Sequence, residues 1–200
     1  MMFTGIVTAQ ARVVKLSRSK DGGTFLFEFD EPFHTMLGAS LAINGVCLTV
    51  ADATDKRIRV VVMPETVKRT TLSHLEVGQR VNVEPALLAA NRLDGHFVLG
   101  HVDTAVQLLK RQPVADSAVL TFELPAQYQD YVVEKGSVTI DGVSLTVTAV
   151  TSRSFSVSLV DYTLTHTNLG DLTIGASVNL ETDILGKYVV HLQKAGVSND

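Results

Sequence analysis

Short runs of alternating apolar and polar residues dominate this chain, and many of the apolar positions are β-branched. This period of two predicts half-buried β-strands. Turn dipeptides separate the runs, among them Asn44-Gly45, which favours a tight hairpin because both residues tolerate a positive φ. In the first half of the chain the pattern predicts strands over 11–16, 24–29, 40–43, 47–51, 57–62 and 80–83.

The second half of the chain repeats this pattern. The segment INGVCLTV at 43–50 matches IDGVSLTV at 140–147 in six of eight positions, and the correspondence continues in both directions at a separation of 95 to 97 residues. A repeat of this length indicates a duplicated domain. The separation changes by two residues around 31–37 and 126–133, which predicts a loop there.

Each copy therefore contains about six short strands, and closing such a sheet removes its exposed edges. The sequence predicts an all-β protein of two tandem homologous antiparallel closed barrels with short helices and a C-terminal helix. Helical spacing is found at 125–135, more weakly at 32–37, and at 184–194. The predicted boundaries are 1–90 for the first barrel, 91–183 for the second, 184–200 for a C-terminal oligomerisation helix and tail, and 88–94 for the linker.

Composition and motifs exclude several classes of function. The net charge of −4 comes without a basic stripe, so nucleic acid is not an expected partner. One cysteine and six histidines without chelating spacing predict no metal site and no disulfide. No long apolar run and no basic signal sequence are found, which predicts no membrane partner and a cytoplasmic location. The motifs G-x-S-x-G, G-x-x-x-x-G-K-[ST] and G-x-G-x-x-G are absent.

Differences between the two copies mark candidate functional residues. Cys47 stands where the second copy has Ser144; a lone cysteine is more often a small core residue, but a position beside a hairpin turn at a barrel mouth favours ligand contact. Asp183 stands where the first copy has Ala86, and both a solvated carboxylate and a functional acid are open readings.

Two further features involve histidine and threonine. His96 and His101 lie five residues apart in GHFVLGHVD and cannot share one face, so we expect one hydrogen-bonded structural histidine and one accessible functional histidine. The threonine-rich runs at 68–71 and 165–168 are most typical of turns and helix caps. A second interpretation is that their hydroxyls donate hydrogen bonds to a polyol.

Five motifs in order resemble the riboflavin synthase family over nearly all of the chain. They are MFTGIV, the pair NGVCLTV and DGVSLTV, MPETVKRTTL, GHFVLGHVD and VNLETDILGKY. The resemblance implies two six-stranded barrels, a homotrimer assembled by the C-terminal helix, and sites between the first barrel of one subunit and the second barrel of its neighbour. It implies that two molecules of 6,7-dimethyl-8-ribityllumazine exchange a four-carbon unit, giving riboflavin and 5-amino-6-ribitylamino-uracil, with no cofactor and no metal.

The resemblance also implies site residues. Phe3 is expected to cap a ring, Cys47 and Ser40 to contact or activate the lumazine of the first barrel, and His101 and Asp183, assigned to the second barrel, to handle protons or bind the ribityl chain. The full expected set is Cys47, Ser40, His101 and Asp183 as catalytic residues, with Phe3, Thr4, Thr49, Met63, Thr66, Lys135, Asp141, Ser144 and Thr146 as substrate-binding residues.

Three places depart from the family's usual pattern. Asp94-Gly95-His96 stands where the family usually has Gly-Gly-His, and Leu99 occupies a position that is usually polar or small. Residues 160–163, Val-Asp-Tyr-Thr, replace the more usual Ile-Pro-x-Thr. Two other functions compete with this one. The first is a lumazine- or flavin-binding protein without activity. The second is a flavin-dependent reductase, but that enzyme would need a nucleotide-binding domain that 200 residues cannot hold. Both G-V-x-L-T-V hairpins are intact, which favours the enzyme.

Overall fold

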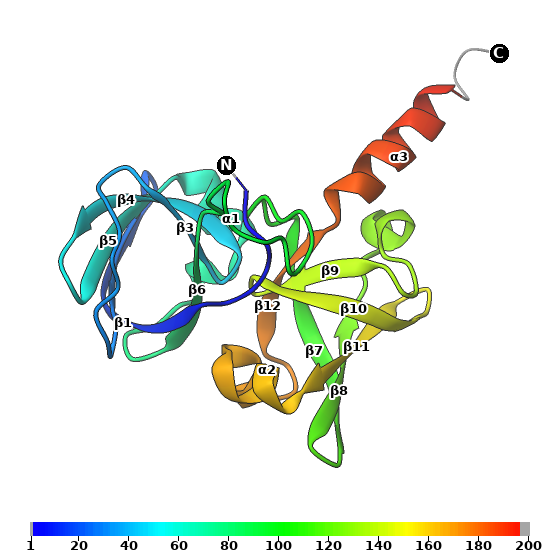
Figure 1. Cartoon of the computed structure of the whole chain (residues 1–200). Helices are drawn as coiled ribbons and strands as arrows, with labels where there is room; N and C mark the ends of the chain where they lie inside the picture. Colours follow the sequence, from blue (N-terminus) through cyan, green and yellow to red (C-terminus); the bar gives the residue numbers. More distant parts are fainter. Residues whose placement is uncertain (1, 197–200) are drawn as a thin grey trace.

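The computed structural model describes residues 2–196 and confirms the predicted fold class (Figure 1). The strands form two closed six-stranded antiparallel barrels with equivalent strand orders, β1-β2-β5-β4-β3-β6 and β7-β8-β11-β10-β9-β12. The first barrel contains β1 (Ala9–Ser19), β2 (Gly22–Glu28), β3 (Ser40–Ile43), β4 (Val46–Ala53), β5 (Arg57–Val62) and β6 (Arg80–Pro85). The second contains β7 (Thr104–Val114), β8 (Ser117–Glu123), β9 (Ser137–Ile140), β10 (Val143–Val150), β11 (Ser154–Val160) and β12 (Ser177–Thr182).

Each barrel is closed around its own apolar core, as the alternation predicts. In β4 the inward side chains Val46, Leu48 and Val50 are buried, and β10 repeats this pattern. Burying a large aliphatic or aromatic side chain stabilises the fold by about 1.5–3 kcal/mol. The predicted loop difference is also confirmed, because residues 124–136 between β8 and β9 outnumber residues 29–39 between β2 and β3 by two.

The helices differ in part from the prediction. The expected helix at 125–135 is a shorter 3-10 helix, η2 (Ala126–Tyr131), and the weak expectation at 32–37 was wrong, because that segment has no helix. The C-terminal helix is confirmed as α3 (Ile184–Gly196), and it projects away from both barrels (Figure 1). Four short helices were not predicted: α1 (Pro64–Arg69), η1 (Thr71–Ser73), α2 (Asp161–His166) and η3 (Asn168–Asp171).

The threonine-rich runs act as turns and caps, as expected. The Thr70 hydroxyl donates to the Thr66 carbonyl at 2.7 Å, and in the second copy Thr167 repeats this bond to Thr163. The Thr167 side chain also accepts from the Leu169 N–H at the start of η3.

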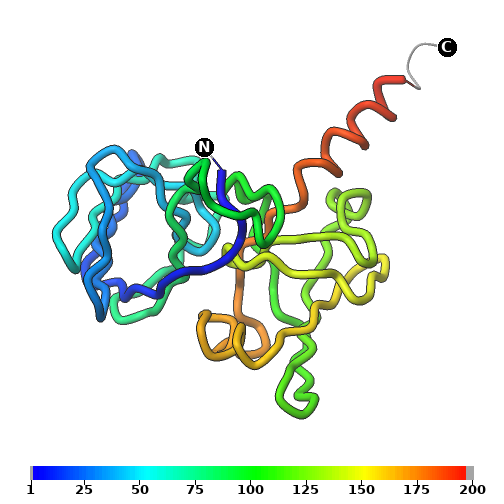
Figure 2. The backbone as a smooth tube through the Cα atoms, in the orientation of Figure 1, coloured from blue at the N-terminus to red at the C-terminus, as the bar shows by residue number. Residues whose placement is uncertain are grey.

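Two extended segments cross between the barrels, which the sequence did not predict. We call residues 2–8 the N-terminal strap and residues 97–103 the central strap; Figure 2 shows them between the two barrels. Phe3 and Val98, which are equivalent in the repeat, pair with each other through N–H to carbonyl bonds of 2.7 and 3.2 Å. Beyond this pair, Val7 packs on the core of the second barrel and Val102 on the core of the first. Each strap therefore covers the opposite barrel.

The two repeated hairpin turns meet back to back between the barrels. Asn44 and Asp141 both have a φ of 44°, and Gly45 and Gly142 follow them with a φ of 74° and 79°. A Cβ added to Gly45 would lie 2.7 Å from the Gly142 nitrogen, and the reverse holds for Gly142. Glycine is required here by the left-handed backbone and by the close approach together.

Paired asparagines join these turns across the barrels. The Asn82 side chain donates to the Asp141 carbonyl at 2.9 Å, and its counterpart Asn179 donates to the Asn44 carbonyl at 2.8 Å. Both asparagines are 1% exposed, so each amide would be costly to leave without partners. This reciprocal pairing, together with the glycine contact, forms what we call the seam.

The glycine contact at the seam can be tested with a matched pair of substitutions. Gly38 has a similar φ of 80°, but a Cβ there would meet nothing within 4 Å. Gly38→Ala therefore measures the backbone strain alone. Gly45→Ala adds a collision with the second barrel, so we expect it to lower the free energy of unfolding by about 2 kcal/mol more, as overpacking does. Equal losses for both variants in urea denaturation would show that the turns do not press on each other.

Candidate functional site

The first candidate hollow has a volume of about 450 Å³ and brings three predicted residues together. Cys47, Thr66 and His101 all line it. Cys47 lies on β4 and Thr66 on α1, while His101 arrives on the central strap. The assignment of His101 to the second barrel was therefore wrong, because the strap carries this residue across to the first.

Cys47 is fixed by a close backbone contact with that strap. Its N–H donates to the Gly100 carbonyl at 2.8 Å, and a Cβ on Gly100 would lie 2.6 Å from the Cys47 Cβ. The side chain is half-buried, and burial raises the pKa of the Cys47 thiol. At neutral pH this residue therefore presents a neutral S–H group and not a thiolate nucleophile.

The rim of the first hollow differs from the equivalent rim of the second barrel. Glu65 forms an ion pair with Arg69 along α1, and this pair lowers the pKa of Glu65. At the equivalent positions of α2, Tyr162 stacks on His166 with ring centroids 4.0 Å apart. An aromatic pair in the second copy thus stands where the first copy has a charged pair.

A second and larger hollow, of about 790 Å³, lies beside strands β3 and β6 of the first barrel. Ser40 lines it together with Thr4. Thr4 is buried, and both its N–H and its hydroxyl donate to Glu84, at 2.7 and 2.8 Å. Ser40 pairs across β3 and β4 with Thr49, whose side chain is exposed.

In the second barrel a histidine that the expected site omitted contacts the predicted residue Ser144 and also Thr139. His96 Nδ1 lies 2.7 Å from the Ser144 hydroxyl, and Nε2 lies 3.3 Å from the Thr139 hydroxyl. Burial lowers the pKa of His96, and the nearby Asp183 carboxylate opposes this shift. As expected, one histidine, His96, is hydrogen-bonded and the other, His101, is exposed; their structural and functional roles stay predictions. Only this spacing argument pointed to His96.

Several predicted residues take structural places. Asp183 caps α3, because its carboxylate accepts from the Leu185 N–H at 2.9 Å. Phe3 is fully buried against Ala42 and Val98, so its ring faces neither hollow of the first barrel. Their roles toward a ligand stay predictions, as do those of three exposed residues, Met63, Lys135 and Thr146.

Known proteins match this architecture along nearly the whole chain. The lumazine binding domain family matches twice, at residues 4–86 and 99–183. The riboflavin synthase of Mycobacterium tuberculosis is 41% identical over 97% of this chain and 99% of that protein. The riboflavin synthase of Actinobacillus pleuropneumoniae is 38% identical over 94% of this chain and 88% of that protein.

The chain belongs to the riboflavin synthase family. Among solved structures, LumP complexed with riboflavin superposes with a TM-score of 0.82, and LumP complexed with 6,7-dimethyl-8-(1'-D-ribityl) lumazine with 0.80. Both are 22% identical and cover 90% of this chain and 99% of LumP, which supports the shared fold.

Within residues 2–196 of this family member, no cluster of three or more His, Cys, Asp or Glu side chains could hold a metal ion. None of the helices in this part of the chain is long and apolar enough to cross a membrane.

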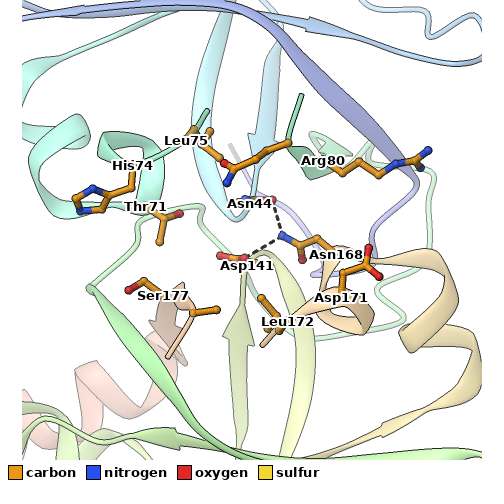
Figure 3. A pocket seen from close by; sticks show the side chains of 12 residues that line it. Asn44, Thr71, His74, Leu75, Arg80, Asp141, Asn168, Asp171, Leu172 and Ser177 are labelled. Atoms are coloured by element: carbon orange, nitrogen blue, oxygen red, sulfur yellow. Dashed lines mark hydrogen bonds between the residues drawn. The ribbon is translucent and has the colours of Figure 1, made fainter. Parts of the chain in front are cut away.

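A third hollow, of about 330 Å³, opens on the seam and contains the predicted residue Asp141 (Figure 3). The Asn168 amide bridges the two turns there, donating to Asp141 Oδ2 at 3.0 Å and to Asn44 Oδ1 at 3.3 Å. Asp141 Oδ1 accepts from the Asn179 N–H at 2.7 Å within the second barrel, so among the described residues the carboxylate is linked to the first barrel only through the Asn168 bridge. The structure thus separates Asp141 from both hollows of the first barrel.

Asp141 also makes stability depend on pH. Burial raises its pKa from 3.8 to about 7, and the bonds from Asn179 and Asn168 only partly oppose this. Between these two values the folded protein keeps a proton that the unfolded chain has lost. Raising the pH through this window therefore lowers the free energy of unfolding, and the loss is complete above pH 7.

We expect Asp141→Asn to remove this loss, which is on the order of 4 kcal/mol at 1.36 kcal/mol per pKa unit. The first copy already has an amide, Asn44, at the equivalent position. Asn44→Asp is the matched control and should steepen the loss. Unfolding by urea between pH 4 and 8 measures both, and an unchanged pH slope in Asp141→Asn would exclude Asp141 as its source.

Proposed function

We propose that this protein is a riboflavin synthase that converts two molecules of 6,7-dimethyl-8-ribityllumazine into riboflavin and 5-amino-6-ribitylamino-uracil. One observation carries the proposal: the barrels repeat one architecture but present different polar groups, Cys47 and His101 at the first and His96 with Ser144 at the second. Two copies of one substrate that play opposite roles, donor and acceptor of a four-carbon unit, need such a pair of related but unequal sites.

The proposed reaction is a transfer between like molecules. The two products together contain all atoms of the two substrates, so neither an oxidant nor a reductant is consumed. Holding two rings face to face supplies about 7–11 kcal/mol of the barrier reduction, whereas one positioned acid or base supplies about 10²–10⁴-fold in rate. The protein's first task is therefore orientation.

Within the first hollow the chemistry divides between neutral and titratable groups. His101 is the exposed residue that can accept or return a proton, while the neutral Cys47 thiol contacts the ring and donates weakly. Ser40 offers a hydroxyl from the neighbouring hollow. Transfer requires that a second lumazine, held by a second barrel, reach this hollow.

We infer that a neighbouring subunit supplies that second barrel in a homotrimer. The support is α3, which projects from the barrels and exposes Leu185, Tyr188, Val189 and Leu192 by 56–69% (Figure 1). Such an apolar face on a helix indicates contact with another chain. Asp183, at the start of α3, also acts on the polar pair His96 and Ser144 of the second barrel, because its charge partly opposes the lowering of the His96 pKa.

The alternative is a protein that binds lumazine or flavin without converting it, on the fold that LumP also has. Incubating the purified chain with the lumazine alone separates the two functions. We expect riboflavin fluorescence to appear together with 5-amino-6-ribitylamino-uracil in equal amounts. Tight binding with no riboflavin would establish the binding protein instead.

Cys47→Ser tests the role of the thiol. The second copy already has serine at this hairpin position, so we expect normal folding. Because the packed, weakly donating thiol is replaced by a smaller and more strongly hydrated hydroxyl, we expect riboflavin formation to fall about tenfold or more, at the lower end of what one positioned group contributes. A loss of stability by a few kcal/mol with unchanged activity per folded molecule would instead show that Cys47 is a core residue.

Substitutions on α3 test the assembly. Tyr188→Ser with Leu192→Ser removes exposed apolar surface while leaving the cap at Asp183 and the pair of Lys187 with Asp103 intact. We expect monomers in sedimentation that still bind ligand but form riboflavin at least about 100-fold more slowly, because the orientation contribution is lost. A fully active monomer would place both substrates within one chain.

Mixing two inactive variants is a second test of assembly. A Cys47 variant mixed with an Asp183 variant should recover activity, because hybrid trimers contain some sites built from the intact first barrel of one chain and the intact second barrel of the other.

A further inference from the structure

The two straps are anchored by equivalent carboxylates, but not equally well. Glu84 on β6 accepts three hydrogen bonds from the N-terminal strap, from the N–H and hydroxyl of Thr4 and from the Gly5 N–H at 3.0 Å. Glu181 on β12 accepts one hydrogen bond of normal geometry from the central strap, from the Leu99 N–H at 2.8 Å, while the Gly100 N–H has only a weaker effect, seen in the Glu181 pKa. Within residues 2–196, the Oε2 atom of Glu181 has no hydrogen-bond partner.

One of the two missing hydrogen bonds is explained by a single residue. The repeat aligns Leu99 with Thr4, and leucine has no hydroxyl. In the first copy the Thr4 hydroxyl donates to Glu84 and also accepts from the Ile6 N–H at 3.1 Å. The counterpart of Ile6 is His101. The two carboxylates are equally buried, at 5% and 4% exposure, so their environments differ in hydrogen bonding and not in access to water.

Each anchor acts on the opposite barrel. Glu84 holds the strap whose Gly5 carbonyl accepts from the Ser144 N–H at 2.7 Å. Glu181 holds the strap whose Gly100 carbonyl accepts from the Cys47 N–H at 2.8 Å. A chain of two hydrogen bonds thus connects a carboxylate of the second barrel to the thiol-bearing residue of the first.

We propose that Glu181 is a positioning residue that acts across the barrels, setting through Leu99 and Gly100 the placement and electrostatic environment of Cys47, and that Leu99 keeps this anchor weak. The proposal rests on the proposed function only where it gives Cys47 a part in the reaction. The connection itself stands on the strap geometry.

The charge of Glu181 changes near neutral pH. Burial raises its pKa to about 7, the nearby Asp103 adds to the rise, and the strap N–H groups and Lys187 oppose it. Lys187 and Asp103 pair with each other at 2.8 Å. Ionised Glu181 in turn raises the pKa of the Cys47 thiol, in addition to the larger effect of burial. The thiol should therefore become harder to ionise as Glu181 loses its proton.

Alkylation of Cys47 by iodoacetamide measures this directly, because the chain has no other cysteine. Only the thiolate reacts, so the rate should rise tenfold per pH unit below the thiol pKa. In the wild type we expect a shoulder near pH 7, where Glu181 ionises. Glu181→Gln should remove the shoulder and raise the rate at pH 8 about threefold or more, the effect of half a pKa unit.

Two further variants keep the test decisive if Glu181→Gln folds poorly. Leu99→Thr restores the hydroxyl of the first copy and should move the shoulder about one pH unit toward acid, since a hydrogen bond to the ionised form lowers its pKa. Glu84→Gln is the matched control, because its strap leads to Ser144 and should leave the Cys47 profile unchanged. A wild-type profile in Leu99→Thr, or one altered equally by both glutamine variants, would overturn the proposal.

Activity gives a separate readout. If the protein forms riboflavin, its pH profile should move in the same direction in Leu99→Thr as the alkylation profile. If it forms none but the alkylation profiles shift as expected, the proposed function fails and the cross-barrel anchor stands. If riboflavin forms with an unshifted profile while alkylation shifts, Cys47 is positioned by Glu181 but does not limit the reaction.

Discussion

The back-to-back contact of two glycine turns is the constraint on which the rest of this structure depends. Gly45 and Gly142 approach closely enough that neither position has room for a Cβ, and the asparagine pairs hold them in that register. Beside these turns each strap reaches the opposite barrel, where its glycine carbonyl accepts from the N–H of Cys47 or Ser144. The first hollow therefore depends on how the barrels are joined, since His101 enters it on the central strap of the other copy.

A duplicated scaffold makes small departures from symmetry informative. The amide network repeats nearly bond for bond, yet the counterpart of the Asn168 bridge is Thr71, whose hydroxyl has no partner within residues 2–196. Asp141 replaces an amide, Leu99 a hydroxyl, and Tyr162 with His166 a charged pair. Each change leaves the strands in place and alters the charge or hydrogen bonding near a hollow. Function can diverge between the copies in this way while the shared fold keeps both barrels stable.

The sequence predicted the barrels well because their determinants are local. Alternation, β-branched residues and the turn at Asn44-Gly45 act within a few positions, and the repeat tested each assignment twice. The short helices were missed because six residues such as Pro64–Arg69 carry too little periodicity to detect. The crossing straps were missed for another reason: they are fixed by contacts between residues about 80 to 95 positions apart, such as Thr4 with Glu84 and Phe3 with Val98, which no local pattern records.

The same distinction explains what could be predicted of the site. Cys47, Thr66 and His101 were named singly, but their common hollow depends on the crossing, and His101 was therefore assigned to the wrong barrel. Asp141 was named as a ligand contact, which stays a prediction, whereas its burial and its hydrogen bonds at the seam depend on the meeting of the two barrels, which no motif records. A residue's chemistry can be recognised from its motif, whereas its surroundings depend on which barrel the strap reaches. For this chain the crossing converts two similar barrels into one connected unit, in which a carboxylate of one barrel acts on the thiol of the other.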